Sequence, residues 1–98
     1  MRRGEIWSLA DGRDVLVVSL DGLEDAYGAV LAIVLHPPGR YPDTAMSVVI
    51  GDPHPSTAVA VNVQQLAVKR FAGAVLAGAV PAETMTRVDQ ALRAVLDL

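Results

Sequence analysis

The sequence contains no cysteine, which excludes disulfide bridges and thiolate metal sites. Aromatic residues make up only 4% of the chain, although its hydrophobic fraction reaches 52%. The longest apolar runs, Ala29–Leu35 and Phe71–Ala82, fall well short of the roughly 20 residues that a transmembrane helix needs. No secretory apolar stretch follows Met1–Glu5, so we expect no signal peptide. These absences predict a soluble, cytoplasmic protein with no membrane partner.

The chain is short, and we expect residues 1–98 to form a single domain. A domain of this size has little interior for so much Val, Leu and Ala, so the surplus predicts an apolar patch covered by a second subunit. The net charge of −3 argues against nonspecific nucleic-acid binding. The positions of the positive charges are nevertheless compatible with one basic face. Six cations that lie before the last two predicted segments of the chain could form it: Arg2, Arg3, Arg13, Arg40, Lys69 and Arg70.

Short β-friendly segments separated by turns predict a mainly β protein. Asp11-Gly12 is typical of a hairpin turn, since glycine supplies its positive-φ position. Asp21–Asp25 is expected to be an acidic loop, and Asn62–Leu66 a single helical turn. Gly73 and Gly78 make Ala67–Arg70 and Ala74–Ala79 weaker candidates for regular structure. The predicted strands are Glu5–Leu9, Asp14–Leu20 (buried on both faces), Ala29–Leu35, Ala45–Ile50 and Thr57–Val61.

The last segment predicts an amphipathic helix from about Ala82 to Leu98 that closes the β structure. Pro81 suits the start of a helix, and Glu83 favours a helix N-terminus. Apolar residues recur at spacings of three and four and define one stripe that we expect to be buried: Met85, Val88, Leu92, Val95 and Leu96.

Few residues carry obvious chemistry, because the chain has no Gly-rich phosphate loop, metal-ligand cluster or nucleophile elbow. His36 lies where an apolar strand meets a Pro-Pro loop; it is either a proton-transfer group or an ordinary loop residue. His54 stands between two prolines and is interpreted as structural. Arg13 is a surface cation that can pair with a neighbouring aspartate. Trp7 is expected in the core, although Trp7 and Tyr27 can also stack on a base.

Four segments, in order along nearly the whole chain, resemble the MazF/PemK (Kid) toxin family. Arg2–Trp7 resembles the family's "RRGEIW" start, and Arg13–Val18 resembles its "RPVLVV" strand. Asn62–Leu66 resembles "ANVSQL", and Pro81–Leu92 resembles the terminal "SPETMARVDEAL" helix. The resemblance implies an SH3-like barrel of antiparallel strands with a C-terminal helix, as in MazF, CcdB and Kid.

The same resemblance implies the toxin of a type II toxin–antitoxin system. Such a toxin is a homodimer that is bound by a cognate antitoxin. It is also a sequence-specific endoribonuclease that cleaves single-stranded RNA, such as mRNA, without a metal or other cofactor and leaves a 2′,3′-cyclic phosphate.

The resemblance also implies the site residues. The family's catalytic arginine matches Arg13, but the proline that follows it is Asp14 here. Its catalytic threonine or serine aligns with His36, and its long first hairpin loop is reduced to Ala10–Gly12. We therefore assign catalysis to Arg13 and His36, no residue to a metal, and substrate binding to Arg40, Gln64, Lys69 and Arg70.

Two alternatives to a ribonuclease remain open at the level of sequence. One is a non-enzymatic CcdB-like toxin that binds a protein such as DNA gyrase. The other is an inactive paralogue that still dimerises and binds antitoxins. The low net basicity and the shortened loop favour these alternatives, whereas Arg13 favours the enzyme.

Overall fold

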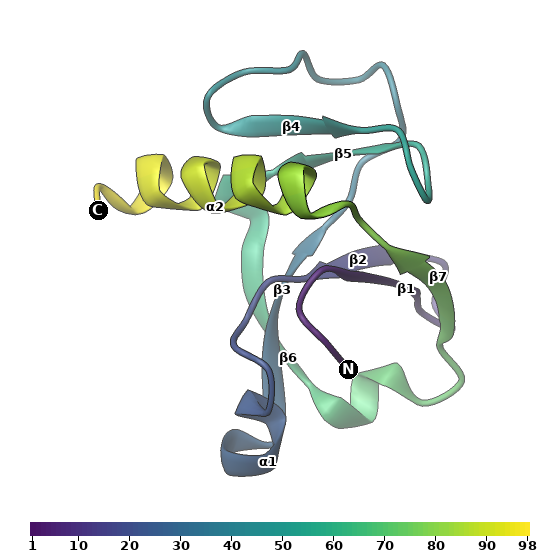
Figure 1. Cartoon of the computed structure of the whole chain (residues 1–98). Coiled ribbons are helices and arrows are strands. Elements are labelled where there is room, and N and C mark those ends of the chain that lie inside the picture. The colour runs from purple at the N-terminus through teal and green to yellow at the C-terminus, as the bar shows by residue number, and fades with distance from the viewer.

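The computed structural model describes all residues, 1–98, as two antiparallel sheets with a helix laid across them (Figure 1). The larger sheet has the strand order β6-β3-β2-β1-β7, and the smaller pairs β4 with β5. This is the SH3-like barrel with a C-terminal helix that the sequence predicts. The strands are β1 (Glu5–Ser8), β2 (Asp14–Val17), β3 (Ala29–Val34), β4 (Ser47–Ile50), β5 (Ser56–Val59), β6 (Val63–Ala67) and β7 (Val75–Ala79).

Strands β2 and β3 lie next to each other within the large sheet, and most of their side chains are buried on both faces. On one face, Leu16 and Ile33 belong to the core that the small sheet and the C-terminal helix complete. On the other, Val15 and Val17 pack in a second apolar cluster, which Trp7 and Phe71 border: Leu9, Val15, Val17, Val30, Ala32 and Leu66. Burial on both faces explains the continuous apolar pattern of these strands, except at Leu31 of β3, which is 41% exposed.

Helix α2 (Ala82–Leu96) covers the first core, as predicted, but it ends two residues before the predicted Leu98, because Asp97 caps it in the left-handed conformation. Met85, Val88 and Ala91 are buried, and Leu92 and Val95 pack partly against them. Leu96 was expected in the same stripe, but that prediction is wrong, because its side chain is 57% exposed. The helix outruns the core by its last turn, so the apolar spacing continues where nothing covers it.

Three short helices lie where the sequence analysis expected other structure. Asp21–Asp25 is not simply a loop, since helix α1 (Leu23–Tyr27) begins within it. The helical turn predicted at Asn62–Leu66 is displaced: the 3₁₀ helix η1 occupies Ala60–Asn62 and strand β6 follows. Val68–Phe71 forms a second 3₁₀ helix, η2. Neither α-helix has the length and apolar character that a membrane span requires.

Candidate functional site

One cavity brings together the side chains that carry chemistry. Its volume is about 380 Å³, and its polar lining consists of Arg13, Asp14, His36 and His54. The remaining lining residues are Gly12, Leu35, Pro37, Pro38 and Pro55. Three segments form its walls: the turn between β1 and β2, the loop that follows β3, and the turn that leads into β5.

Backbone hydrogen bonds hold these three segments together. The Leu35 N–H donates to the Asp14 carbonyl at 2.8 Å, which fixes the end of β3 beside the start of β2. His36 and Thr57 exchange N–H to carbonyl hydrogen bonds, both 3.0 Å long. This isolated bridge joins the large sheet to β5 of the small sheet. The cavity therefore lies at a junction of the two sheets, on backbone that is firmly paired.

Arg13 reaches the cavity from a tight turn that also supplies its counter-charge. Gly12 has the positive φ of 93° that the Asp-Gly pattern predicts. The Arg13 guanidinium contacts the Asp11 carboxylate at 3.0 Å, as expected for an arginine beside aspartates. The Arg13 backbone N–H donates to this carboxylate and is the main cause that holds the pKa of Asp11 below its usual value. The Arg13 side chain also donates to it and lowers the pKa further. Arg70 approaches the same carboxylate at 3.7 Å, so Asp11 lies between two guanidinium groups.

His36 is held by side chains on two sides. Its Nε2 lies 2.8 Å from the Asn62 amide nitrogen. The Asn62 amide can donate from its nitrogen or accept at its oxygen, so this contact orients the imidazole in its neutral or its protonated form. The Tyr41 ring packs against the imidazole at 4.7 Å between centroids, and the Arg40 guanidinium lies 6.0 Å from the Tyr41 centroid. Asn62 is a contact of His36 that the sequence does not reveal, because no local pattern links the two residues.

His54 contacts an aspartate that also lines the cavity. Its Nε2 lies 2.9 Å from Asp14 Oδ2, while the Ser8 hydroxyl donates to Asp14 Oδ1 at 2.6 Å. Ser8 and Asp14 are register partners in β1 and β2, whereas His54 is 40 residues away in the chain. No spacing in the sequence reveals this pair, since it forms only when the turn before β5 folds onto β2.

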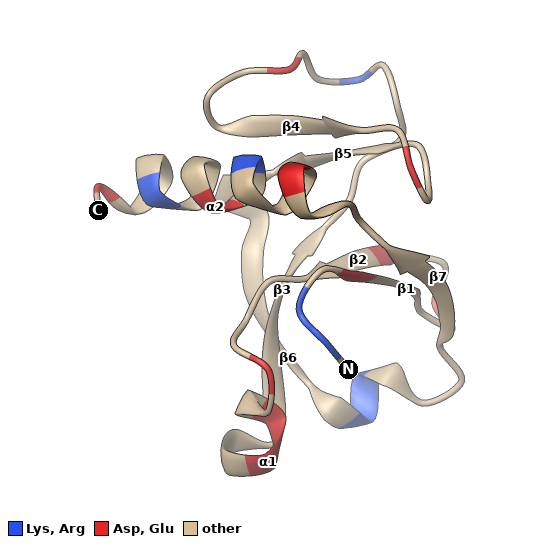
Figure 2. Ribbon diagram, viewed as in Figure 1, with Lys and Arg blue, Asp and Glu red and all other residues tan.

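The other predicted substrate-binding residues lie outside the cavity. Gln64 is exposed on β6, and Lys69 is exposed on η2 beside Arg70. Figure 2 shows the basic positions dispersed over the N-terminal segment, η2, the loop before β4 and α2. Arg3 pairs with Asp89 of α2, so it does not join a basic patch around Arg13. The predicted single basic face therefore does not form. Arg13 and Arg70 share one aspartate, and Arg40 lies beside Tyr41.

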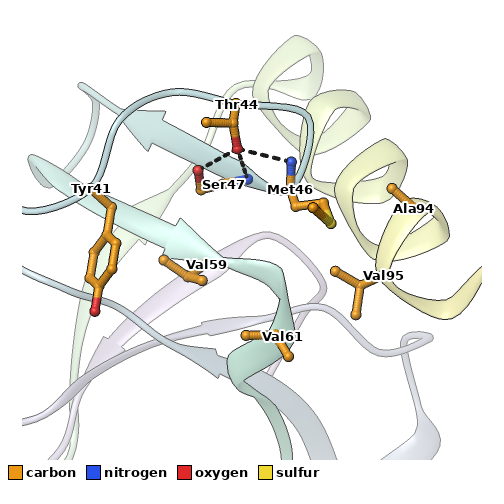
Figure 3. Close-up of a pocket in the computed structure, with 8 residues that line it drawn as sticks. All are labelled: Tyr41, Thr44, Met46, Ser47, Val59, Val61, Ala94 and Val95. Carbon is orange, nitrogen blue, oxygen red and sulfur yellow. Dashed lines mark hydrogen bonds between the residues drawn. The ribbon is translucent and has the colours of Figure 1, made fainter.

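A second, larger cavity of about 520 Å³ is apolar (Figure 3). It lies between the end of α2 and the β4–β5 sheet, and Tyr41 contributes its only titratable side chain. The Thr44 hydroxyl lies at one edge, 2.7 Å from the Ser47 hydroxyl. Its lining residues are Tyr41, Thr44, Met46, Ser47, Val59, Val61, Ala94 and Val95. With no cation and no imidazole, this groove has none of the groups that phosphoryl chemistry requires.

Comparison with known proteins defines the fold. No family model and no curated protein matches the sequence, but solved structures of MazF toxins and endoribonucleases superpose on the entire chain. Each of these structures is under 25% identical to this chain. The chain therefore has the fold of MazF toxins.

Three particular structures illustrate the likeness. An endoribonuclease from a mycobacterial species matches with a TM-score of 0.88 and 23% identity, over 100% of this chain and 92% of that chain. An endoribonuclease in complex with its cognate antitoxin, also mycobacterial, has a TM-score of 0.86 and 22% identity, over 100% and 96%. MazE-MazF from Deinococcus radiodurans (form II) has a TM-score of 0.83 and 19% identity, over 100% and 96%.

Proposed function

We propose that this chain is a toxin of the MazF/PemK type that cleaves single-stranded RNA. The observation that carries the proposal is that Arg13 and His36 line one cavity. They are the two residues to which the sequence resemblance assigns catalysis. The fold supports the proposal, because the similar structures include proteins named endoribonucleases.

The proposed reaction is an internal transesterification. The RNA 2′-hydroxyl loses a proton, its oxygen bonds to phosphorus, and the bond from phosphorus to the 5′-oxygen breaks. The 5′-oxygen gains a proton, so the products are a 2′,3′-cyclic phosphate and a 5′-hydroxyl. Arg13 stabilises the negative charge that builds on the phosphoryl oxygens, since its guanidinium is permanently charged. His36 transfers one of the two protons, a role that suits imidazole near neutral pH.

The proposed partners follow from exposed residues and from the comparisons. Several large apolar side chains are more than half exposed, among them Leu20, Tyr27, Val61 and Val75, and a homodimer would cover part of this surface. We also propose a cognate antitoxin, because one similar endoribonuclease was solved with its own. Arg40, Gln64, Lys69 and Arg70, which lie outside the cavity, are proposed to contact the RNA beyond it.

Cleavage of RNA in EDTA tests the proposed activity. Wild-type protein should cut a long single-stranded RNA of mixed sequence and leave the cyclic phosphate. Arg13→Ala should reduce the rate about 10²–10³-fold, because it removes charge stabilisation in the transition state. Arg93→Ala is the matched control, since Arg93 is exposed in the last turn of α2 and should retain full activity. RNA left intact by the wild-type protein, in EDTA and in magnesium, would refute the enzyme and favour the inactive, antitoxin-binding alternative.

Substitutions of His36 test its role separately. His36→Ala should lower the rate about 10²–10⁴-fold if the imidazole transfers a proton. A loss of only a few-fold, with an unchanged pH profile, would mark His36 as an ordinary loop residue. His36→Thr restores the residue type of the family. Lower activity than the wild type indicates that the imidazole has become part of the mechanism. Higher activity than the wild type indicates that the histidine marks a decayed site.

A further inference from the structure

The proposed reaction moves two protons, and His36 accounts for only one of them. One other imidazole lines the same cavity, that of His54. Its side chain is 39% exposed, so it is accessible to a bound ligand. We propose that His54 is the second catalytic residue, the general base, and that Asp14 positions it; this assignment rests on the proposed function.

The contact with Asp14 fixes how the His54 ring carries its proton. An ionised carboxylate only accepts hydrogen bonds, so the ring nitrogen that faces it, Nε2, carries the hydrogen. The neutral ring then has its lone pair on Nδ1, which is the form that a general base needs. Once Nδ1 accepts the 2′-hydroxyl proton, the Asp14 carboxylate at 2.9 Å stabilises the resulting imidazolium.

Asp14 is itself held in place for this role. The Ser8 hydroxyl donates to Asp14 Oδ1 across the β1–β2 register, which leaves Oδ2 for the imidazole. The Asp14 side chain is 28% exposed, less than that of the histidine. Ser8 of β1 therefore holds Asp14 of β2, and Asp14 holds His54, which lines the cavity with it. The charged and titratable groups that share the cavity with His54 are Arg13, Asp14 and His36.

The two imidazoles then divide the chemistry. His54 takes the proton from the 2′-hydroxyl as the new bond from O2′ to phosphorus forms. His36, protonated before the reaction, gives a proton to O5′ as the bond from phosphorus to that oxygen breaks. Arg13 stabilises the charge on the nonbridging oxygens between them. The proton count balances, and each imidazole ends in the state in which the other began.

A structural role for the same pair makes a different prediction. If the contact between Asp14 and His54 only anchors the turn before β5, its loss should lower thermal stability and leave the pH profile unchanged. His54→Gln separates the two roles, because the glutamine amide can still donate to Asp14 but cannot transfer a proton. We expect His54→Gln to melt like the wild type and to cleave RNA about 10²–10⁴-fold more slowly.

The decisive measurements are the pH profile and the rate on a modified substrate. The wild type should give a bell-shaped profile; His54→Gln should lose the rising limb, and His36→Ala the falling limb. Free imidazole should partly restore His54→Ala. An RNA with sulfur at the scissile 5′ position needs no acid for its leaving group, so it should rescue His36→Ala but not His54→Gln. Asp14→Asn should lower the rate less than His54→Gln does and displace the rising limb.

Failure of the proposed function and failure of the His54 assignment alone give different results. A wild type that leaves RNA intact refutes the proposed function and the base with it. With an active wild type, a less than tenfold loss in His54→Gln and an intact rising limb refute the base alone, as does rescue of His54→Gln by the 5′-sulfur substrate.

Discussion

Arg13 is bound by Asp11 at three points. The Asp11 Oδ1 accepts the Arg13 backbone N–H at 3.0 Å, and Oδ2 lies 3.1 Å from Nε and 3.0 Å from Nη2 of the same residue. The residue proposed to stabilise a phosphoryl group is therefore already engaged by a carboxylate. We therefore expect a phosphate ligand to compete with Asp11 for the guanidinium, while the same contacts hold Arg13 in place.

Asp11→Asn should accordingly strengthen binding of an anionic ligand. The asparagine oxygen still accepts the Arg13 N–H and keeps the turn, while the charge shared by Arg13 and Arg70 is removed. A single-stranded DNA, which lacks the 2′-hydroxyl, provides an uncleavable probe. We expect its Kd at low salt to fall about two- to fivefold, as for loss of a competing exposed ion pair. Fluorescence anisotropy would measure this change, and added salt should diminish it.

Asp43→Asn is the control for that experiment. It removes the same charge from an aspartate whose partner, Arg87, belongs to α2 and not to the cavity. Its DNA affinity should match the wild type. An equal gain for both variants would indicate a general effect of net charge, and no gain for Asp11→Asn would show that Asp11 does not compete with the ligand.

The same Asp43 should make stability depend on acidity. The Arg87 side chain donates to Asp43 at 2.6 Å, and the Val49 N–H donates to it at 2.9 Å. Both hydrogen bonds hold the pKa of Asp43 below its usual 3.8, and the bond from Arg87 has the larger effect. A lowered pKa in the folded state stabilises the protein at pH values above 3.8, and that contribution disappears as the pH falls through the lowered value. Urea unfolding should therefore show wild type more stable than Asp43→Asn at neutral pH, with the difference vanishing in strong acid. A difference that persists in acid would contradict this account.

Helix α2 offers a matched pair of leucines for testing the core. Leu92 packs partly against the buried cluster, whereas Leu96, four residues later, is 57% exposed. Leu92→Ala should lower the free energy of unfolding by about 2 kcal/mol, at the low end for a buried leucine because the site is partly open. Leu96→Ala should change it by less than about 0.5 kcal/mol. Equal costs in denaturant titrations would show that the last turn is covered, for example by a second subunit.

The sequence predicts those parts of the fold that local patterns specify. The apolar runs of β2 and β3, the Asp-Gly turn and the spacing of α2 each follow from a period or a turn rule. Leu96 shows the limit of this reasoning, because a helical period states which residues share a face but not where the neighbouring element ends. The displaced helical turn at Ala60–Asn62 has a similar origin: β6 is set by pairing with β3, which no local pattern records.

The candidate site was predictable only where a residue follows a motif. The resemblance points to Arg13 and His36, and the structure places both at one cavity. Asn62 and the pair of Asp14 with His54 depend on contacts across 26 and 40 residues. In the sequence, His54 is only a turn residue between two prolines. Its proposed role depends on the contact with Asp14, which forms when this turn folds onto β2.

Gly78 tests whether the turn that carries His54 is held from outside the cavity. It has a φ of 135°, and a methyl group added there would lie 2.9 Å from the Pro53 ring. Gly78→Ala should therefore lower the free energy of unfolding by about 1–3 kcal/mol through backbone strain. The steric contact with Pro53 should also move the adjacent His54 away from Asp14. Gly51→Ala is the control in the same turn, since its added methyl meets nothing and its φ is not in the positive region; it should melt within a few degrees of wild type. The readouts are thermal melts and the NMR signal of the His54 imidazole. Equal melting of the two variants, with an unmoved His54 signal, would mean that the turn is held by its own contacts with Asp14 and does not depend on β7.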